Sequence, residues 1–284
     1  MGLLTPASWD LTGRVVANEA VSRGLLRLDL ELPQPVDFAP GQFAMLNLGG
    51  SRRLVFRRPL SILAVDGRVI SFLYRVVGRG TAQMADLRPG ETMDCLAPLG
   101  HPFPAPEADT PPALLLAGGV GLPPLHGWWK VHGRPGDLAC FGGRDGADVP
   151  WTLLPEPWQV SVDHATDLPA GRAVHHGLVT ELALDRLAAA ADGGASPRLV
   201  LACGPTPLLR AAASLARERG WPCHVSLEEH MGCGYGVCKG CVVPVISDDL
   251  EGWRNANSCT EGPVFDAAAL DWDRFAVHHA GGAS

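Results

Sequence analysis

The sequence lacks the features that would direct a chain to nucleic acid or to a membrane. It has no block of basic residues, and its formal net charge is −7, which argues against a nucleic-acid partner. Its longest apolar stretch, around residues 113–125, is broken by glycine and proline and is too short to span a bilayer. The first residues show no basic region followed by a long apolar core, as a secretory signal would. We therefore expect a cytoplasmic protein with no membrane attachment.

Cysteine is too sparse for a disulfide-stabilised secreted scaffold, because only eight occur in 284 residues. The sequence also shows no internal repeat and no low-complexity linker. Its length predicts about two domains, or three small ones. A hydrophobic content of 46% is sufficient for a sizeable core.

Four of the cysteines stand close together near the C-terminus and have a spacing with chemical meaning. Cys233, Cys238 and Cys241 form a C-x4-C-x2-C run, and Cys259 follows after a gap of 17 residues. Plant-type ferredoxins bind a [2Fe–2S] cluster with this order of cysteines. Glycines at positions 232, 234, 236 and 240 would let backbone N–H groups approach cluster sulfurs closely. A one-electron centre is the leading hypothesis.

Zinc is the alternative metal for these four cysteines. A zinc site usually shows paired C-x2-4-C knuckles, whereas here one short pair stands beside a C-x4 step, so the spacing favours the cluster without excluding zinc. The remaining cysteines have no ligand spacing, and we expect them to be small buried hydrophobic residues. They are Cys95, Cys140, Cys203 and Cys223.

The first hundred residues have the pattern of β-structure. Leucines at 26, 28, 30 and 32 alternate with charged residues, which predicts a half-buried strand. Further strands are expected over residues 42–48 and 68–77, the latter rich in β-branched and aromatic residues. Short strands separated by glycine and proline predict an antiparallel barrel. The proline-rich segment 102–112 is expected to be a linker.

After this segment strands and helices alternate. The expected strands are Ala113–Ala117, Leu138–Phe141, Trp158–Val162 and Arg198–Ala202. Helices are expected over residues 176–191, with Leu178, Leu182 and Leu187 on one side, and over residues 205–219. Alternation of this kind predicts an α/β domain with a parallel sheet.

Two strand-to-loop junctions in the α/β part have residues suited to a bound ligand. Gly118, Gly119 and Gly121 follow the first buried strand, and Cys203-Gly204-Pro205 follows the last. Glycines at the carboxyl end of a parallel strand let a pyrophosphate approach backbone amides and the next helix N-terminus. A tight structural turn would also require glycine, so the motif alone does not settle a nucleotide site.

The barrel part contains Arg57-Arg58-Pro59-Leu60-Ser61 and Gly78-Arg79-Gly80-Thr81. Arginine can neutralise a diphosphate or bond a flavin in planar forked geometry, and the second motif adds backbone and hydroxyl donors. A pair of arginines on a solvated face is the alternative, and the spacing alone does not specify flavin.

The order of these motifs resembles the ferredoxin–NADP reductase superfamily. More narrowly, the chain resembles the electron-transfer subunits of class 1B dihydroorotate dehydrogenase over about residues 12–270. The narrower resemblance depends on two segments, Glu228–Cys241 and Cys259–Asp266. The gap before Cys259 is longer than in that pattern, and residues 248–257 have the character of an insertion.

The resemblance implies three domains: an FAD-binding barrel (10–104), an NAD-binding α/β domain (111–222) and a small [2Fe–2S] domain (223–284). The implied FAD site comprises Arg58, Pro59, Leu60, Ser61, Leu73, Tyr74, Arg75, Gly80 and Thr81. The implied NAD site comprises Gly118, Gly119, Gly121, Cys203, Gly204 and Pro205. The implied cluster ligands are Cys233, Cys238, Cys241 and Cys259. Arg144 leaves NAD and NADP both open, since it could meet a 2′-phosphate.

The resemblance also implies an enzyme subunit with a partner. A nicotinamide exchanges two electrons as hydride and a cluster exchanges one, and a flavin can divide the pair. In this family dihydroorotate is oxidised at the FMN of a catalytic subunit, and electrons pass through the cluster and FAD to NAD+ during pyrimidine biosynthesis. The family forms heterotetramers of two catalytic and two electron-transfer subunits. No dihydroorotate site is then expected in this chain.

One alternative function is a reductase of the same kind that serves another acceptor, and a second is a non-enzymatic interaction module stabilised by a zinc-bound tail. Ferredoxin:NADP+ transhydrogenation, sulfide reduction and a hydrogenase diaphorase would share most of these motifs. Glu228, Glu229 and His230 precede the cysteine run. We interpret them as solvated surface residues, and contact with a partner or a flavin is the alternative.

Overall fold

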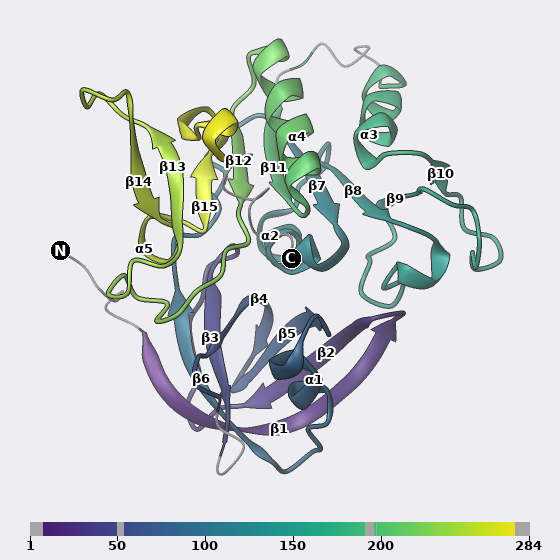
Figure 1. Cartoon of the computed structure of the whole chain (residues 1–284). Helices are drawn as coiled ribbons and strands as arrows, with labels where there is room; N and C mark the ends of the chain where they lie inside the picture. The colour runs from purple at the N-terminus through teal and green to yellow at the C-terminus, as the bar shows by residue number, and fades with distance from the viewer. Residues whose placement is uncertain (1–7, 50–53, 191–195, 197, 276–284) are drawn as a thin grey trace.

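The computed structural model describes residues 8–49, 54–190, 196 and 198–275. Its N-terminal part is a closed antiparallel barrel with the strand order β1-β2-β5-β4-β3-β6. The strands are β1 (Trp9–Ser22), β2 (Leu25–Glu31), β3 (Phe43–Leu48), β4 (Arg58–Asp66), β5 (Val69–Arg75) and β6 (Thr92–Leu99). Helix α1 (Arg79–Ala85) lies between β5 and β6 in the chain. The barrel forms the lower half of the molecule in Figure 1, and the antiparallel barrel expected from the sequence is confirmed.

The alternation of residues on β2 gives the strand one buried face and one solvent-facing side. Leu28 and Leu30 are fully buried in the barrel interior, while Asp29 and Glu31 are half-buried on the other side of the strand. Arg27 donates from Nε to Asp29 Oδ1 at 2.8 Å along that outer side. Successive side chains of a strand point to opposite faces, so one face fills the core and the other meets solvent.

The second part is a seven-stranded sheet with the order β10-β9-β8-β7-β11-β12-β15. Its strands are β7 (Ala113–Gly118), β8 (Leu138–Gly143), β9 (Gln159–Val162), β10 (His175–His176), β11 (Leu199–Cys203), β12 (Cys223–Ser226) and β15 (Val264–Asp266). The helices are η2 (Gly119–Gly121), α2 (Leu122–His132), η3 (Gly146–Asp148), α3 (Val179–Ala188) and α4 (Thr206–Arg219). All pairs are parallel except β12 with β15, so the expected α/β parallel-sheet domain is confirmed.

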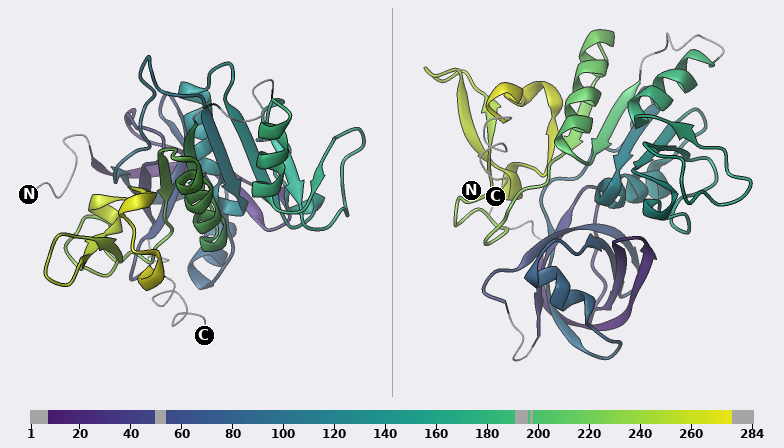
Figure 2. Two further views of the ribbon diagram at one scale, coloured as in Figure 1. Left: turned by 90° about the horizontal axis from the view of Figure 1, so that it is seen from above. Right: turned by 45° about the vertical axis from the view of Figure 1, so that its right-hand side comes forward.

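Helices cover the sheet on both faces. Helices α3 and α4 pack on one face through a core that includes Leu182 and Leu209. Helix α2 packs on the other face and also against the barrel, in a core that includes Leu73, Leu125 and Trp128. The views in Figure 2 place α2 between sheet and barrel. The segment 102–112 contains no helix or strand, and Trp128 Nε1 donates to the Pro104 carbonyl at 2.9 Å.

The helix expected over residues 176–191 is shorter in the structure. Helix α3 begins at Val179, and His175–His176 instead form β10, parallel to β9. Gly177 has φ +127°, which stops a helix from starting earlier, and Glu181 accepts from the Leu178 N–H at 2.9 Å. Leu178 is therefore 58% exposed rather than part of the buried face. Ala191 lies outside the described residues.

The C-terminal segment is joined to the sheet rather than set apart from it. A hairpin of β13 (Val242–Ile246) and β14 (Trp253–Asn257) precedes α5 (Ser258–Glu261), β15 and η4 (Ala267–Ala269). The hairpin projects at the upper left of Figure 1. Strand β12 begins at Cys223 and pairs with β11, and β15 adds to its free edge. The sheet therefore continues past residue 222, where the expected boundary falls.

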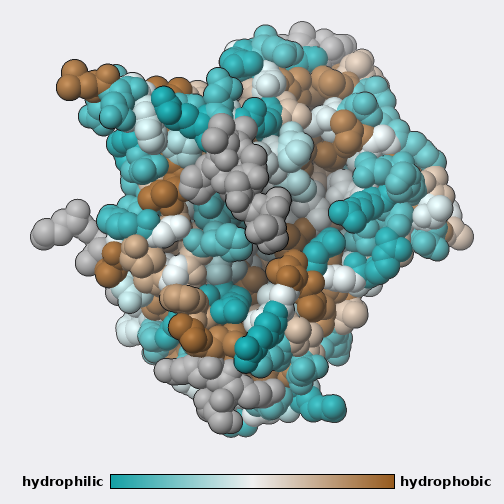
Figure 3. All heavy atoms as spheres, viewed as in Figure 1, coloured by the Kyte–Doolittle hydropathy of each residue, from teal (hydrophilic) through white to brown (hydrophobic). Residues whose placement is uncertain are grey.

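The outer surface mixes hydrophilic and apolar residues. In Figure 3 apolar side chains come to the surface where the barrel meets the part above it. No helix among the described residues is long and apolar enough to cross a membrane.

Candidate functional site

A cavity of about 450 Å³ opens at the carboxyl ends of the parallel strands. Its walls come from the loops after β7, β8, β9 and β10, from the starts of α3 and α4, and from Arg75 and Glu228 of other parts. Ligands of open α/β sheets bind at these strand ends. The cavity therefore has the location that the sequence predicted for a nucleotide.

The two predicted glycine loops meet behind this cavity. Gly204 has φ +152°, and a Cβ on it would lie 3.1 Å from the backbone of Gly118. A Cβ on Gly121 would overlap the carbonyl of Cys203. The contact between the loops thus requires glycine on both sides.

The six predicted nucleotide residues divide into two groups. Gly118, Gly119 and Pro205 line the cavity, while Gly121, Cys203 and Gly204 are not among its lining residues. The Cys203 side chain is buried in the core between sheet and barrel, and burial raises the pKa of its thiol. Cys203 therefore supports the loop from behind.

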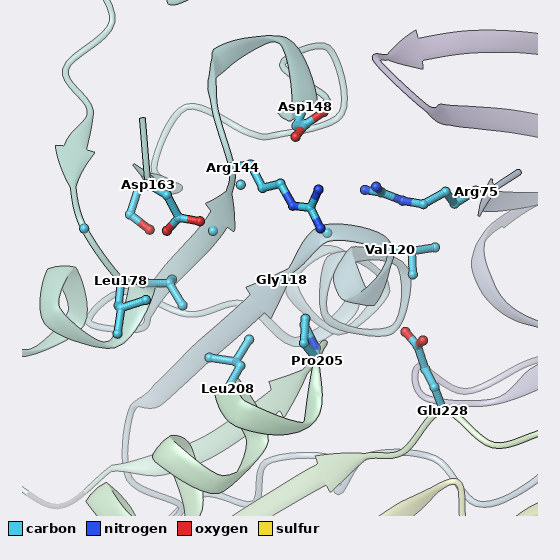
Figure 4. Close-up of a pocket in the computed structure, with 16 residues that line it drawn as sticks. Arg75, Gly118, Val120, Arg144, Asp148, Asp163, Leu178, Pro205, Leu208 and Glu228 are labelled. Carbon is cyan, nitrogen blue, oxygen red and sulfur yellow. The ribbon is translucent and has the colours of Figure 1, made fainter. Parts of the chain in front are cut away.

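Charged side chains complete the cavity wall (Figure 4). Arg75 at the end of β5 and Arg144 after β8 point toward one another above Val120. Glu228 approaches from the opposite wall, and burial among protein atoms raises the pKa of its carboxyl group, an effect that Arg75 opposes. Asp163 stands at the far end, after β9.

Sequence reasoning assigned these residues other roles or none. Glu228 is solvent-exposed, as expected of a surface residue, and it also lines the cavity. Arg75 was expected at the flavin, and the structure places it in the wall of the nucleotide cavity. Asp163 was not singled out. Its position directly after β9, at the carboxyl edge of the sheet, is the signal that could have identified it.

The two expected flavin motifs come together at one side of the barrel. The guanidinium of Arg58, on β4, lies across Gly80 of α1 so closely that a Cβ there would overlap it. Arg58 also donates from Nη1 to the carbonyl of Phe56. Thr81 Oγ1 accepts from the N–H groups of Val77 (2.9 Å) and Gly78 (3.2 Å). Thr81 thus orders the turn beside the Arg58 guanidinium, and an arginine held in place in this way suits a diphosphate.

Two further predicted flavin residues have buried side chains. Tyr74 is fully buried in the barrel and donates from its hydroxyl to Asn18 Oδ1 at 2.9 Å. Burial raises the pKa of Tyr74 to about 12. Leu73 packs into the core below α2. The barrel and interdomain cores therefore occupy these two side chains, and only their backbone groups are available to a ligand.

The four predicted cluster cysteines gather as two pairs. Cys238 donates its backbone N–H to Cys233 Sγ at 3.5 Å, and Cys259 donates to Cys241 Sγ at 3.4 Å. Cys241 and Cys259 are 2% exposed, whereas Cys238 is exposed. A [2Fe–2S] cluster is held by four thiolates, two on each iron, so two adjacent pairs fit it. The described residues contain no group of three or more metal-binding side chains gathered for a single ion.

Local hydrogen bonds favour the ionised form of two of these thiols, Cys233 and Cys241. Burial alone would raise the pKa of Cys233, but backbone N–H donors from Cys238, Tyr235 and Val237 lower it to about 7. A hydrogen bond from the Cys259 thiol lowers the pKa of Cys241 to about 6 and correspondingly raises that of Cys259. Thiolate is the form that binds metal. The donor set and its surroundings thus fit an iron–sulfur cluster.

The cluster loop rests directly on the barrel. Met231, Cys241 and Cys259 form an apolar cluster with Phe43, Met45, Leu96 and Leu99 of β3 and β6. Gly234, with φ +84°, lies so close to Met45 that a Cβ would overlap its side chain. Met45 pairs in register with Pro59 on β4. One strand therefore separates the flavin motif from the cluster loop.

The four cysteines outside the cluster motif are buried free thiols, as expected of small hydrophobic residues. Burial raises the pKa of Cys95, Cys140 and Cys223 to about 12. None of the eight cysteines, all of which are described, forms a disulfide.

The chain is similar to known proteins over most of its length. Residues 228–271 match the iron-sulfur cluster binding domain of dihydroorotate dehydrogenase B. The dihydroorotate dehydrogenase B (NAD(+)) electron transfer subunit of Geobacillus kaustophilus (strain HTA426) is 35% identical over 241 residues, covering 81% of this chain and 86% of that protein. The subunit of the same name from Bacillus cereus (strain AH187) is 32% identical over 269 residues, covering 88% and 94%.

Solved structures with the same fold include two reductases. An NADH-dependent reduced ferredoxin-NADP oxidoreductase, studied for flavin-based electron bifurcation, has a TM-score of 0.76 at 24% identity and covers 95% of this chain and 94% of its own. The ferredoxin reductase of carbazole 1,9a-dioxygenase has a TM-score of 0.64 at 20% identity, with coverage of 77% and 69%. At these identities the likeness concerns the fold.

Proposed function

Because the chain belongs to the family of dihydroorotate dehydrogenase B (NAD(+)) electron transfer subunits, we propose that it carries electrons from a dihydroorotate-oxidising partner to NAD+. It is then an NAD-linked flavin iron–sulfur oxidoreductase subunit of cytoplasmic pyrimidine biosynthesis. The observation that carries this proposal is the short path from flavin motif to cluster loop, in which Met45 contacts Gly234 and pairs with Pro59.

FAD, when bound, exchanges the two electrons of a hydride for single electrons. Arg58 and the turn that ends at Thr81 would hold its charged groups, with Pro59, Leu60 and Ser61 along the same strand. The main chain of Leu73 and Tyr74 would complete that site. Cys233, Cys238, Cys241 and Cys259 would bind the [2Fe–2S] cluster through their thiolates.

NAD(H) would occupy the cavity at the strand ends. The Gly118–Gly119 backbone allows a dinucleotide to approach closely, and Gly121, Cys203 and Gly204 keep that loop in place. Arg75 and Arg144 supply positive charge on two sides of the cavity. Three functional segments follow: a flavin barrel (10–104), a nucleotide domain that starts near residue 111 and includes β12, and the cluster segment after it.

The partner would be an FMN-containing catalytic subunit in a heterotetramer. Cys238 is the exposed member of the four ligands, and the apolar side chains of Val237 and Phe56 beside the loop are 62% and 61% exposed. Gly232 lies between Cys238 and Phe56, since a Cβ on Gly232 would be 3.2 Å from Cys238 Sγ and 4.0 Å from Phe56. This is the side on which a second redox group can approach the cluster.

Co-expression with a family catalytic subunit tests the proposal. We expect a stable complex containing FMN, FAD and iron, with dihydroorotate:NAD+ activity that neither chain has alone. If the chain alone, without a catalytic subunit, reduces ferredoxin, sulfide or a hydrogenase with NAD(P)H, the alternative reductase function would be established instead. A purified chain without flavin and iron–sulfur absorbance would exclude both.

A further inference from the structure

The turn between β1 and β2 carries an arginine out of the barrel and onto the nucleotide domain. The backbone N–H of Arg23 donates to the Ala147 carbonyl at 2.7 Å. Its guanidinium donates from Nη2 to Asp145 Oδ2 at 2.5 Å and from Nε to Asp148 Oδ1 at 3.1 Å. One barrel residue thus makes three hydrogen bonds to three residues of the other domain, all within the segment 145–148.

The two carboxylates depend on this arginine for their counter-charge. The side chains of Asp145 and Asp148 are 12% and 10% exposed, while that of Arg23 is 56% exposed. The Asp145 carboxylate also accepts hydrogen bonds from the N–H groups of Ala147 (3.0 Å) and Asp148 (3.3 Å). These bonds cap the N-terminus of the short helix η3. A carboxylate that is largely removed from water raises the free energy of the folded protein unless a positive charge pairs with it. Because Arg23 pairs with both carboxylates, it fixes the conformation of the segment 145–148.

The same segment forms a wall of the nucleotide cavity. Arg144, immediately before Asp145, directs its guanidinium into the cavity, and Asp148 also lines it (Figure 4). In the described part of the chain the guanidinium of Arg144 has no ion pair with a carboxylate. The nearby Asp148 carboxylate is occupied by Arg23.

We propose that Arg23 is a positioning residue for the nucleotide site. By holding Asp145 and Asp148 from the barrel side, it keeps Asp148 from pairing with Arg144 and leaves that guanidinium for an anionic group of the dinucleotide. The proposal rests on the proposed function, since it takes NAD(H) as the occupant of the cavity. It adds that the affinity for the nucleotide is set in part by a barrel residue that does not line the cavity.

Steady-state kinetics of Arg23→Ala with NADH and ferricyanide test this role, because ferricyanide accepts electrons without the partner subunit. We expect KM for NADH to rise about tenfold while kcat and FAD content stay within twofold of the wild type. Arg23→Lys should fall between the two, since an ammonium cannot bridge two carboxylates in forked geometry. Arg68→Ala is the matched control, because Arg68 is 55% exposed and pairs with Glu31 within the barrel.

The double variant Arg23→Ala/Asp148→Asn separates positioning from loss of structure. An asparagine cannot neutralise Arg144, so KM should return to within threefold of the wild type. An unchanged KM in both Arg23 variants overturns the proposal, as does a double variant whose KM stays raised. Wild-type protein with bound FAD but no NADH oxidation would instead refute the proposed function.

Discussion

Close backbone contact decides which glycines of the nucleotide loops can be replaced. Gly121→Ala places a Cβ against the Cys203 carbonyl, which cannot move without displacing β11. We expect a loss of about 1–3 kcal/mol in stability and weaker NADH binding, measured by thermal unfolding and by KM.

Gly127 provides the matched comparison on the neighbouring helix. A Cβ there would meet the Leu63 carbonyl at 3.5 Å and Pro40 at 3.7 Å, ordinary contact distances. Gly127→Ala should be neutral or stabilise by up to about 1 kcal/mol, because alanine restricts the unfolded chain. Equal melting temperatures for Gly121→Ala and the wild type would contradict the contact argument.

The thiol of Cys238 is the most accessible of the four predicted ligands. Cys238→Ser should abolish the cluster's EPR signal and its visible absorbance, because a hydroxyl is a poor substitute for a thiolate ligand. FAD content and NADH:ferricyanide activity should remain, since the barrel and the nucleotide cavity are untouched. Cys140→Ala, at a buried thiol of the sheet core, is the control that should keep the signal. A persistent signal in Cys238→Ser would remove this residue from the ligand set.

Helix α2 contains a histidine that links its packing to pH. His126 is 4% exposed, and burial, followed by the nearby Lys130, lowers its pKa to about 4 from 6.5. The unfolded chain takes up a proton below pH 6.5 and the folded chain only near pH 4. Stability is therefore complete above pH 6.5 and falls as the pH drops toward 4, by up to about 3 kcal/mol at 1.36 kcal/mol per unit.

His126→Gln should reduce this pH dependence. We expect the difference in unfolding temperature between pH 7 and pH 5 to shrink in the variant, while part of it persists because His224 also has a lowered pKa. His101→Gln, at an exposed histidine, should leave the difference unchanged. An identical pH dependence in His126→Gln and wild type would show that α2 does not account for it.

At the level of elements, periodicity predicted strands and helices where local pattern and packing agree. Leucine alternation identified β2, and the helix over 205–219 differs from α4 by one residue. The helix predicted over 176–191 begins before the observed α3, because the positive φ of Gly177 and the hydrogen bond from the Leu178 N–H to Glu181 set the start of the helix at Val179. Hydrophobic periodicity does not detect a glycine with positive φ or a helix cap. The resemblance assigned Leu73 and Tyr74 to the flavin site, and interdomain and barrel packing buries their side chains, which leaves their backbone groups for that role.

The cysteine site was predictable because its chemistry is encoded in spacing along the chain. The nucleotide cavity was only half predictable, since Arg75, Asp163 and Glu228 come from separate segments that meet only after folding. No local pattern marks such residues. Arg23 is the extreme case, because its significance arises wholly from contact between two domains.

At the scale of the whole molecule, the C-terminal segment completes the nucleotide sheet. Strand β15 pairs with β12 through residues 264–266, and Phe265 and Leu270 belong to the same core as α4. A chain that ends at Leu227 should therefore lose stability in the nucleotide domain as well as the cluster. We expect a lower unfolding temperature and raised KM for NADH, compared with a chain that ends at Phe275. Full NADH affinity in the shorter chain would show that β15 is dispensable.

The contact of Met45 with Gly234, together with the pairing of Met45 with Pro59, has a consequence for the timing of electron flow. The flavin motif and the cluster loop both lie against adjacent strands of the barrel, but the cluster segment is also joined to the nucleotide sheet through β15. A movement of the nucleotide domain as NAD(H) enters and leaves would therefore be transmitted to the gap that an electron crosses. The rate of transfer between the carriers should accordingly change when the nucleotide domain moves.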